Sequence, residues 1–236
     1  MMRSKYYQNR SILGSIYAGV LLFSLQNSAS ALPVGFKDSW MTMGEISRDY
    51  SEANLIYTFG QKTAAGVGVT GLKWTHMTPL GLAHNRRMEM VDTHINHRLA
   101  RWNLPEAQAN IYLQMGVGQA RGNFFAGTQT VLQPGIQLDY ETRRVYAAYK
   151  WHGSYSKALD YTRYSLSGGF SFYKTEYDEW QPWVVLEASR KGGDLKDATE
   201  VTPYIRFIHK TLFIEAGAPF QKGQSQGLKV NFRYTF

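Results

Sequence analysis

The side chains best suited to chemistry in this 236-residue chain are thioethers and imidazoles that cluster in one stretch. His76-Met77 and His84 flank the longest predicted loop, and Met88 and Met90 follow it closely. Thioether sulfur combined with imidazole nitrogen favours Cu(I) or Ag(I), whereas imidazole alone suits zinc or Cu(II). These five residues predict a soft-metal site, with copper as a possible cofactor. The alternative is that the methionines are ordinary apolar side chains, in which case no cofactor is expected.

A second chemical alternative is hydrolysis, because His152 and Ser154 occupy alternate positions at the end of a predicted strand. Alternate residues of a strand point the same way, so both side chains are predicted to face inward. The His152-Gly153-Ser154 sequence resembles the H-x-S element of the lipid A 3-O-deacylase barrels, and this resemblance implies that the imidazole activates the hydroxyl as a nucleophile. That resemblance implies an acid further along, but the matching position holds Leu166, and only Asp160 offers a substitute. No other nucleophile motif or carboxylate pair stands out, so an enzyme is not the first expectation.

Charged side chains recur at alternate positions of strand-like segments, and this pattern predicts a polar barrel interior. Rings of charged side chains in a pore select solutes by sign and size. The two signs are mixed, so structural ion pairs between neighbouring strands are the competing explanation for the same residues. The candidate pore-lining residues are Asp92, His94, Arg98, Glu106, Lys150, Arg163, Glu187, Arg206, Glu215, Lys229 and Arg233.

The elements that would position these residues are β-strands, and the last ten residues show the pattern most clearly. Leu228, Val230, Phe232, Tyr234 and Phe236 are apolar, and polar residues separate them. Strict alternation gives a strand one apolar and one hydrophilic face. In a membrane barrel, lipid covers the first face and the second lines a wet lumen. The segment resembles the closing strand of Gram-negative outer-membrane β-barrels, which implies that Phe236 is part of the signal read by the barrel-assembly machinery.

The first 31 residues have the three parts of a secretory signal peptide. A basic region without acids precedes an apolar stretch, and Ala29-Ser30-Ala31 provides a cleavage site. We expect cleavage after Ala31, so that residues 32–236 form one mature barrel domain. The chain has no cysteine, which excludes disulfides and thiol chemistry. Without the three basic residues of the signal, 23 basic and 18 acidic side chains leave +5, too small an excess to predict nucleic-acid binding.

The rest of the chain predicts twelve strands rich in aromatic and β-branched residues. No segment after the signal reaches the roughly 20 apolar residues of a transmembrane helix. Short and long connections alternate, as periplasmic turns and extracellular loops do in outer-membrane barrels, and this order predicts both termini in the periplasm. Ten or fourteen strands remain alternatives. The predicted strands are 38–48, 52–60, 64–75, 87–101, 106–118, 128–141, 144–153, 161–174, 180–190, 200–209, 211–219 and 227–236.

Aromatic residues gather at the strand ends predicted to be periplasmic, as in the interfacial girdle of a membrane barrel. The members of this predicted ring are Tyr57, Phe59, Trp102, Tyr140, Phe172, Trp180, Phe207, Phe213 and Phe236.

Together these features predict an all-β, antiparallel transmembrane barrel in the cell outer membrane, present as a monomer. Side chains can fill the interior of a barrel of roughly eight strands, and a barrel of twelve strands is wider than that. The expected function is therefore passive passage of a small polar or charged solute, with metal binding or export and lipid-modifying hydrolysis as alternatives. In size and strand number the chain resembles small monomeric porins of the oligogalacturonate and sialic-acid channel type, an architectural resemblance that carries no substrate. The expected partners are outer-membrane lipid, lipopolysaccharide, the assembly machinery and the solute.

Overall fold

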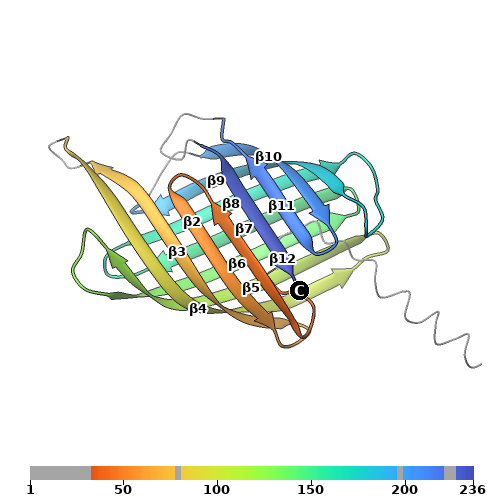
Figure 1. Cartoon of the computed structure of the whole chain (residues 1–236), viewed down its shortest axis with the longest axis horizontal. Coiled ribbons are helices and arrows are strands. Elements are labelled where there is room, and N and C mark those ends of the chain that lie inside the picture. The colour runs from red at the N-terminus through yellow and green to blue at the C-terminus, as the bar shows by residue number, and fades with distance from the viewer. Residues whose placement is uncertain (1–32, 78–80, 196–198, 221–226) are drawn as a thin grey trace, which may run out of the picture.

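Twelve β-strands make up most of the part of the chain that the computed structural model describes, residues 33–77, 81–195, 199–220 and 227–236 (Figure 1). The predicted signal peptide lies outside the described residues. Within them, no helix is long and apolar enough to span a membrane. The strands are β1 (Ser39–Ile46), β2 (Tyr50–Thr58), β3 (Thr63–Met77), β4 (Ala83–Asn103), β5 (Ala107–Gly122), β6 (Gln129–Thr142), β7 (Val145–Tyr155), β8 (Asp160–Ser171), β9 (Gln181–Gly193), β10 (Glu200–His209), β11 (Leu212–Gly217) and β12 (Lys229–Thr235).

The sheet closes on itself into a barrel. Each strand pairs antiparallel with its sequence neighbours, and β1 also pairs with β12, with Met41 opposite Thr235 and Ile46 opposite Val230. Closure pairs the edge strands that an open sheet would leave exposed. The prediction of a twelve-stranded antiparallel barrel is confirmed, and each predicted segment overlaps one observed strand.

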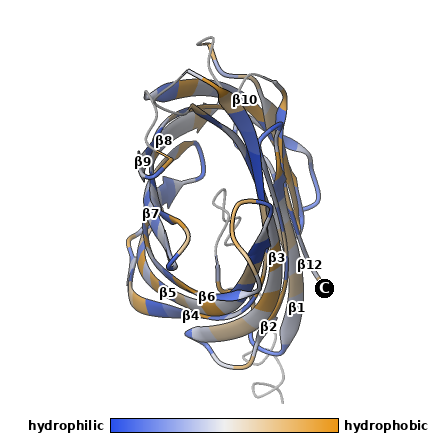
Figure 2. Ribbon diagram, turned by 90° about the vertical axis from the view of Figure 1, so that its left-hand side faces the viewer, coloured by the Kyte–Doolittle hydropathy of each residue, from blue (hydrophilic) through white to orange (hydrophobic). Residues whose placement is uncertain are grey.

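Apolar side chains cover the outside of the barrel, because successive residues of a strand point to opposite faces. Val91 is 61% exposed on β4, whereas its neighbour Asp92 is 7% exposed and faces the lumen. Leu166 on β8 is also 61% exposed. Covering one such aliphatic side chain with hydrocarbon contributes about 1.5–3 kcal/mol. Figure 2 shows the strands arranged as a closed ring, coloured by the hydropathy of each residue.

The two ends of the barrel differ in their connections. At one end, where Ser39 and Thr235 lie, the connections are residues 59–62, 104–106, 143–144, 172–180 and 210–211. We call this the short-connection end. The opposite, long-connection end carries residues 47–49, 78–82, 123–128, 156–159, 194–199 and 218–228.

The alternation of loop lengths is less regular than the sequence predicts. The nine-residue connection 172–180 lies at the short-connection end, and the three-residue turn 47–49 lies at the other. The predicted loop His76–Arg86 shrinks because β3 and β4 stay paired as far as Met77 and Ala83. The β3–β4 hairpin therefore projects beyond β2 (Figure 1).

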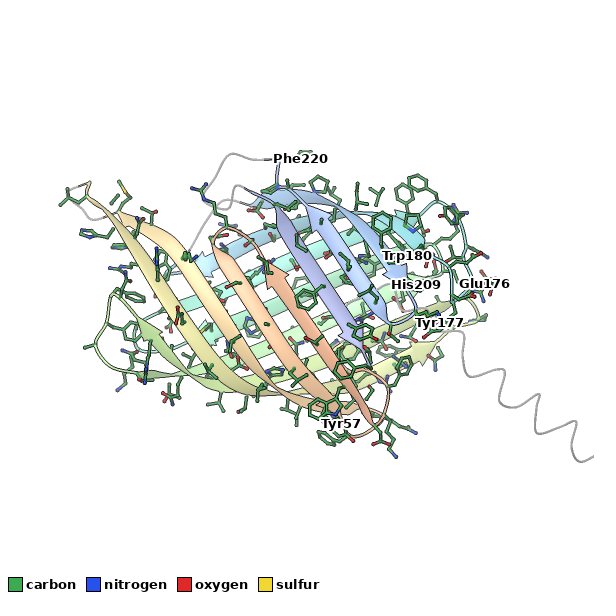
Figure 3. All side chains as sticks on the ribbon, viewed as in Figure 1. Tyr57, Glu176, Tyr177, Trp180, His209 and Phe220 are labelled. Atoms are coloured by element: carbon green, nitrogen blue, oxygen red, sulfur yellow. The ribbon has the colours of Figure 1, made fainter. Side chains whose placement is uncertain are left out.

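Aromatic side chains surround the short-connection end, as predicted. Trp180 stacks on His209 with ring centroids 4.8 Å apart, and both lie at this end in Figure 3. Trp102 is 51% exposed and Phe172 is 60% exposed. Phe213 was wrongly predicted to belong to this ring, because it is 1% exposed and packs inside the barrel.

Candidate functional site

The lumen collects most of the charged side chains that the sequence selects as pore-lining. Asp92, His94, Lys150, Arg163, Glu187, Arg206, Glu215, Lys229 and Arg233 are buried or partly buried on the inward face. Arg98 lies near the short-connection end, where its Nη2 donates to the Gln61 carbonyl at 2.6 Å. Glu106 lies outside the strands, in the β4–β5 connection.

An ion network crosses the lumen at Arg163. This β8 side chain donates from Nη1 to both carboxylate oxygens of Glu45 on β1, at 3.0 and 2.9 Å. Its Nη2 lies 3.7 Å from Oε1 of Glu187 on the neighbouring strand β9. Strands β1 and β8 are not neighbours in the closed sheet, so the Arg163–Glu45 pair bridges opposite walls. Hydrogen bonding of this charge-assisted kind holds both side chains in fixed positions.

A second charged pair lies on one wall beside this bridge. Arg206 on β10 donates to Glu215 on β11 at 2.8 Å, and Asn231 donates to the other Glu215 oxygen at 2.8 Å. The guanidinium also lies over the rings of Tyr146 and Phe213, 4.5 and 4.8 Å from their centroids. Such cation–π contacts stabilise a cation that has lost part of its water. This wall is therefore rigid and polar.

Toward the long-connection end, a second pair crosses between distant segments. Lys191 on β9 donates to Asp49 in the β1–β2 turn at 2.6 Å. Nearby, the Lys229 ammonium contacts the Glu200 carboxylate. These contacts narrow the lumen at a different level from the Arg163–Glu45 bridge.

Sequence reasoning missed three of these carboxylates, Glu45, Asp49 and Glu200. Glu45 shares the inward face of β1 with Met41 and Met43. Because two of these three residues are apolar, the sequence does not identify this face as the polar one. The charge of Glu45 within a short strand was the only signal that could have identified it. Asp49 lies in a turn, where alternation no longer predicts direction.

Two polar cavities lie next to the bridge. The larger, about 200 Å³, is lined by both members of the bridge together with Lys150, Glu52 and His152. The smaller cavity, of about 90 Å³, shares Glu52, Asn54, Gln114 and His152 with the larger one. Its own polar lining residues include Asp92, His94, Asn96 and Gln133.

Two glycines of β3, Gly66 and Gly68, leave room for the side chains that border this smaller cavity. His94 Nδ1 lies 2.8 Å from Asp92 Oδ2, and the two side chains cross the inward positions Gly66 and Gly68 of the next strand. A Cβ at Gly68 would lie 2.8 Å from Asp92 Oδ1, and one at Gly66 would lie 2.9 Å from His94 Nε2. Any larger residue would push these side chains into the cavity.

Residues 33–35, which precede β1, lie inside the lumen toward its short-connection end. Pro33 lines both cavities, and Val34 is 2% exposed in an apolar cluster with Met41, Ile56 and Tyr112. The Gly35 amide donates to the Thr58 hydroxyl at 3.1 Å. No motif in the sequence marks this segment as a lumen element.

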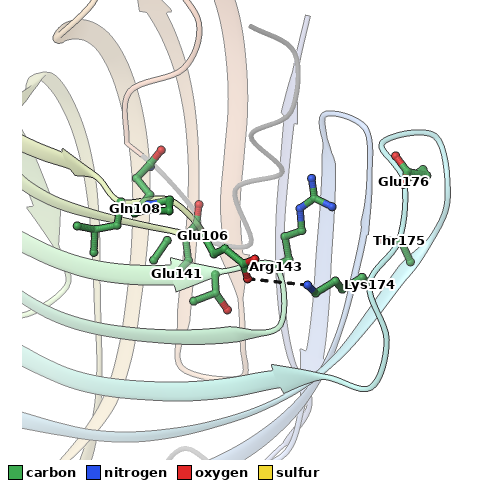
Figure 4. Close-up of a pocket in the computed structure, with 11 residues that line it drawn as sticks. Glu106, Gln108, Glu141, Arg143, Lys174, Thr175 and Glu176 are labelled. Atoms are coloured by element: carbon green, nitrogen blue, oxygen red, sulfur yellow. Dashed lines mark ion pairs between the residues drawn. The ribbon is translucent and has the colours of Figure 1, made fainter. Parts of the chain in front are cut away.

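The mouth at the short-connection end forms a further pocket of about 370 Å³ (Figure 4). Glu106 and Lys174 face each other there at 3.9 Å, which brings the β8–β9 connection toward the β4–β5 connection. The buried side chains of Gln108 and Thr175 also line this pocket, and their polar atoms have no hydrogen-bond partner among the described residues. The mouth therefore offers unpaired polar groups as well as charge.

The candidate metal ligands are distributed over both faces of the β3–β4 hairpin. His76 lies opposite His84 in the register, whereas Met77 is 59% exposed on the other face. Met88 and Met90 are 1% and 2% exposed and belong to a buried apolar cluster inside the barrel. Among the described residues, no group of three or more histidine and carboxylate side chains is arranged to hold a metal ion.

The two candidate catalytic residues, His152 and Ser154, lie in different surroundings. His152 lines the lumen cavities, but the Ser154 hydroxyl is 1% exposed and donates to the sulfur of Met90 at 3.8 Å. Leu166 faces outward, and Asp160 accepts a hydrogen bond from the Ser156 amide instead. No carboxylate orients His152 toward Ser154 in the described hydrogen bonds.

Comparison with known proteins finds only low similarity to solved structures. No protein-family model and no curated protein matches the chain. Among solved structures, the KdgM porin aligns over 84% of this chain and 98% of its own, with 12% identity and a TM-score of 0.44. LpxR from Salmonella typhimurium aligns over 84% and 99%, with 8% identity and a TM-score of 0.45. CdiB from Acinetobacter baumannii aligns over 84% of this chain and 59% of its own, with 7% identity and a TM-score of 0.31. These similarities concern the barrel fold alone.

Proposed function

We propose that this chain is an outer-membrane channel for small polar solutes, narrowed by ion pairs that cross its lumen. The proposal rests on one combination of features. The outer wall is apolar, and cavities of about 200 and 90 Å³ lined by polar side chains lie beside the Arg163–Glu45 bridge. A closed barrel satisfies its backbone hydrogen bonds internally, which is the condition for crossing a bilayer.

The proposed orientation places the short-connection end in the periplasm and the long-connection end outside the cell. Outer-membrane barrels have short periplasmic turns and longer extracellular loops, and aromatic girdles mark both interfaces. The stacked pair Trp180 and His209 supports an interface at the short-connection end.

The proposed selectivity is for size more than for sign of charge. Arg163 lies between Glu45 and Glu187, and Arg206 is paired with Glu215, so cations and anions of the protein alternate around the lumen. A ring of uniform charge excludes solutes that carry the same sign of charge. A wall of mixed charge does not exclude solutes of either sign. A small zwitterion or a neutral polar molecule is therefore the solute class that fits best.

The test is single-channel conductance of the refolded protein in planar bilayers, with and without copper. We expect small, discrete conductance steps with weak ion preference that copper leaves unchanged. A correctly folded protein that runs heat-modifiably on gels but never conducts would overturn the channel proposal. A conductance that copper blocks at low micromolar concentration would favour the metal alternative instead.

A further inference from the structure

A group of cations lies at the rim of the barrel wall at the long-connection end. Arg48, Lys73, Arg86 and Arg87 line a concave site of about 450 Å³ where β3 rises past the β1–β2 turn. We call these four residues the basic hairpin site. Among the residues that the structure describes, none of the four makes an ion pair. The one carboxylate lining the site, Asp49, is bound by Lys191 at 2.6 Å.

Two of these cations face each other directly across the β3–β4 pair. Lys73 lies opposite Arg87 in the register, and both are exposed, while their neighbours Leu72 and Met88 are buried inside the barrel. Like charges directly opposite on adjacent strands destabilise a sheet. The nearest carboxylate on the same outer face of β4 is Glu89, whose register partners are Gly71 and Arg121. A bound anion would relieve the repulsion between Lys73 and Arg87.

The site lies at the depth of lipid headgroups. The last aliphatic pair before these cations on the outer face of this hairpin is Val69 with Val91, and Lys73 with Arg87 follows four residues further along each strand. The pair Met77 with Ala83 lies beyond the cations, near the tip of the hairpin. Four residues of strand span about 13 Å, and a tilt of about 40° reduces this to about 10 Å along the membrane normal. The cations therefore lie beyond the hydrocarbon layer, where phosphate groups of lipids occur.

An aromatic support on the inward face of the hairpin holds one of the cations, Arg86, in place at the rim. The Arg86 guanidinium lies 5.0 Å from the centroid of the Phe124 ring, and Trp74 packs edge-on against the same ring at 5.0 Å. Guanidinium groups bind phosphate oxygens in a bidentate manner. An arginine that is already positioned by an aromatic ring loses less side-chain entropy when it binds phosphate.

We propose that the basic hairpin site binds the phosphate groups of a phosphorylated glycolipid in the outer leaflet. The proposal rests on the orientation given under the proposed function, which places this end at the outer surface. Lys73 and Arg87 on the outer face, with Arg48 and Arg86 at the rim, match a ligand with two phosphates on a short saccharide unit, and the adjoining apolar wall of β3 and β4 matches its acyl chains. The Lys73–Arg87 repulsion explains why the site would hold such a ligand.

The test is native mass spectrometry of the full chain refolded in detergent, titrated with bisphosphorylated lipid A. We expect one retained lipid A per barrel. The triple variant Arg48→Gln, Lys73→Gln, Arg87→Gln should bind at least tenfold more weakly. The matched control Lys37→Gln, Lys62→Gln, Lys210→Gln removes three exposed cations at the opposite end and should bind within twofold of the natural chain. Monophosphorylated lipid A should bind more weakly than the bisphosphorylated form.

Two results would overturn the proposal. One is equal lipid A binding by the triple variant and the natural chain. The other is binding of inorganic phosphate as tightly as lipid A, which would make the site one for free anions. Because no current is measured, a barrel that fails to conduct can still pass this test, so the two proposals fail separately.

A second variant keeps the test independent of folding defects. Arg87→Glu replaces the like-charge pair with an opposite-charge pair, so it should raise the melting temperature in lipid-free detergent while weakening lipid A binding. A lower melting temperature together with unchanged lipid A binding would contradict the inference.

Discussion

Replacing Arg163 with glutamine tests whether the cross-lumen bridge lies in the permeation pathway. The change removes the cation that joins β8 to β1 but keeps a polar side chain of similar reach. Glu45 and Glu187 would then face the lumen without the cation that lies between them. We expect both the conductance and the preference for cations to rise.

The size of the effect follows from Coulomb's law. A unit charge about 6 Å from a permeating ion changes its energy by about 0.7 kcal/mol at the dielectric constant of water and by about 2.8 kcal/mol at an effective value of 20. The change lowers the energy of a cation and raises that of an anion by the same amount. Each 1.36 kcal/mol corresponds to a factor of ten, so the ratio of cation to anion permeability should rise by roughly 10-fold to 10,000-fold. Because the Arg163 and Glu45 side chains are 23% and 17% exposed, we expect a value near the lower end.

The assay is the reversal potential of the refolded variant in a planar bilayer under a potassium chloride gradient. The double variant Arg163→Gln, Glu45→Gln removes one charge of each sign, so its selectivity should return toward that of the natural chain while its conductance stays raised. Lys62→Gln, in a connection outside the lumen, serves as a control that should change neither quantity.

An unchanged reversal potential in the folded Arg163→Gln variant would refute this reasoning. It would mean that ions do not pass within a few ångströms of the bridge. A shift of equal size in Lys62→Gln would show that general surface charge, and not the lumen network, sets the selectivity.

Three other predictions concern the ends of the chain and its orientation. Val34→Asp should raise conductance at least twofold, because a carboxylate cannot remain in the buried cluster that holds this segment in the lumen; single-channel recording checks this. Deleting Phe236 should lower the amount of protein in the outer membrane and increase its degradation in the periplasm, as measured by fractionation and immunoblotting; normal surface levels would contradict an assembly role. Cysteine at Lys157 should react with an impermeant maleimide on intact cells, whereas cysteine at Asn103 should not, and the reverse pattern would invert the proposed orientation.

Strand positions could be predicted because their signal is local. Alternation of apolar and polar residues over about ten positions is visible in β4, β5 and β12, and it fixes which side chains face inward. Phe213 shows the limit of this reasoning. An aromatic residue at a strand end suits either an interfacial girdle or an interior cluster, and only the placement of Arg206 and Tyr146 around it decides for the interior.

Strand ends were harder to predict than strands. Residues such as His76 and His84 resemble loop residues in type, yet they pair across the β3–β4 hairpin and extend both strands. Pairing depends on the partner strand as well as on the residue itself, so local composition underestimates its extent.

The sequence by itself predicted a closed antiparallel barrel with polar residues inside, because period-two alternation gives each strand one apolar face and the predicted signal peptide favours lipid over a second protein layer as its cover. It also selected Arg163 and Glu187 as inward charges. Only the tertiary structure decided that Arg163 meets Glu45, a residue 118 positions away on the opposite wall. Alternation specifies the direction of a side chain but not the distance across the lumen, which depends on strand number, tilt and register around the whole barrel.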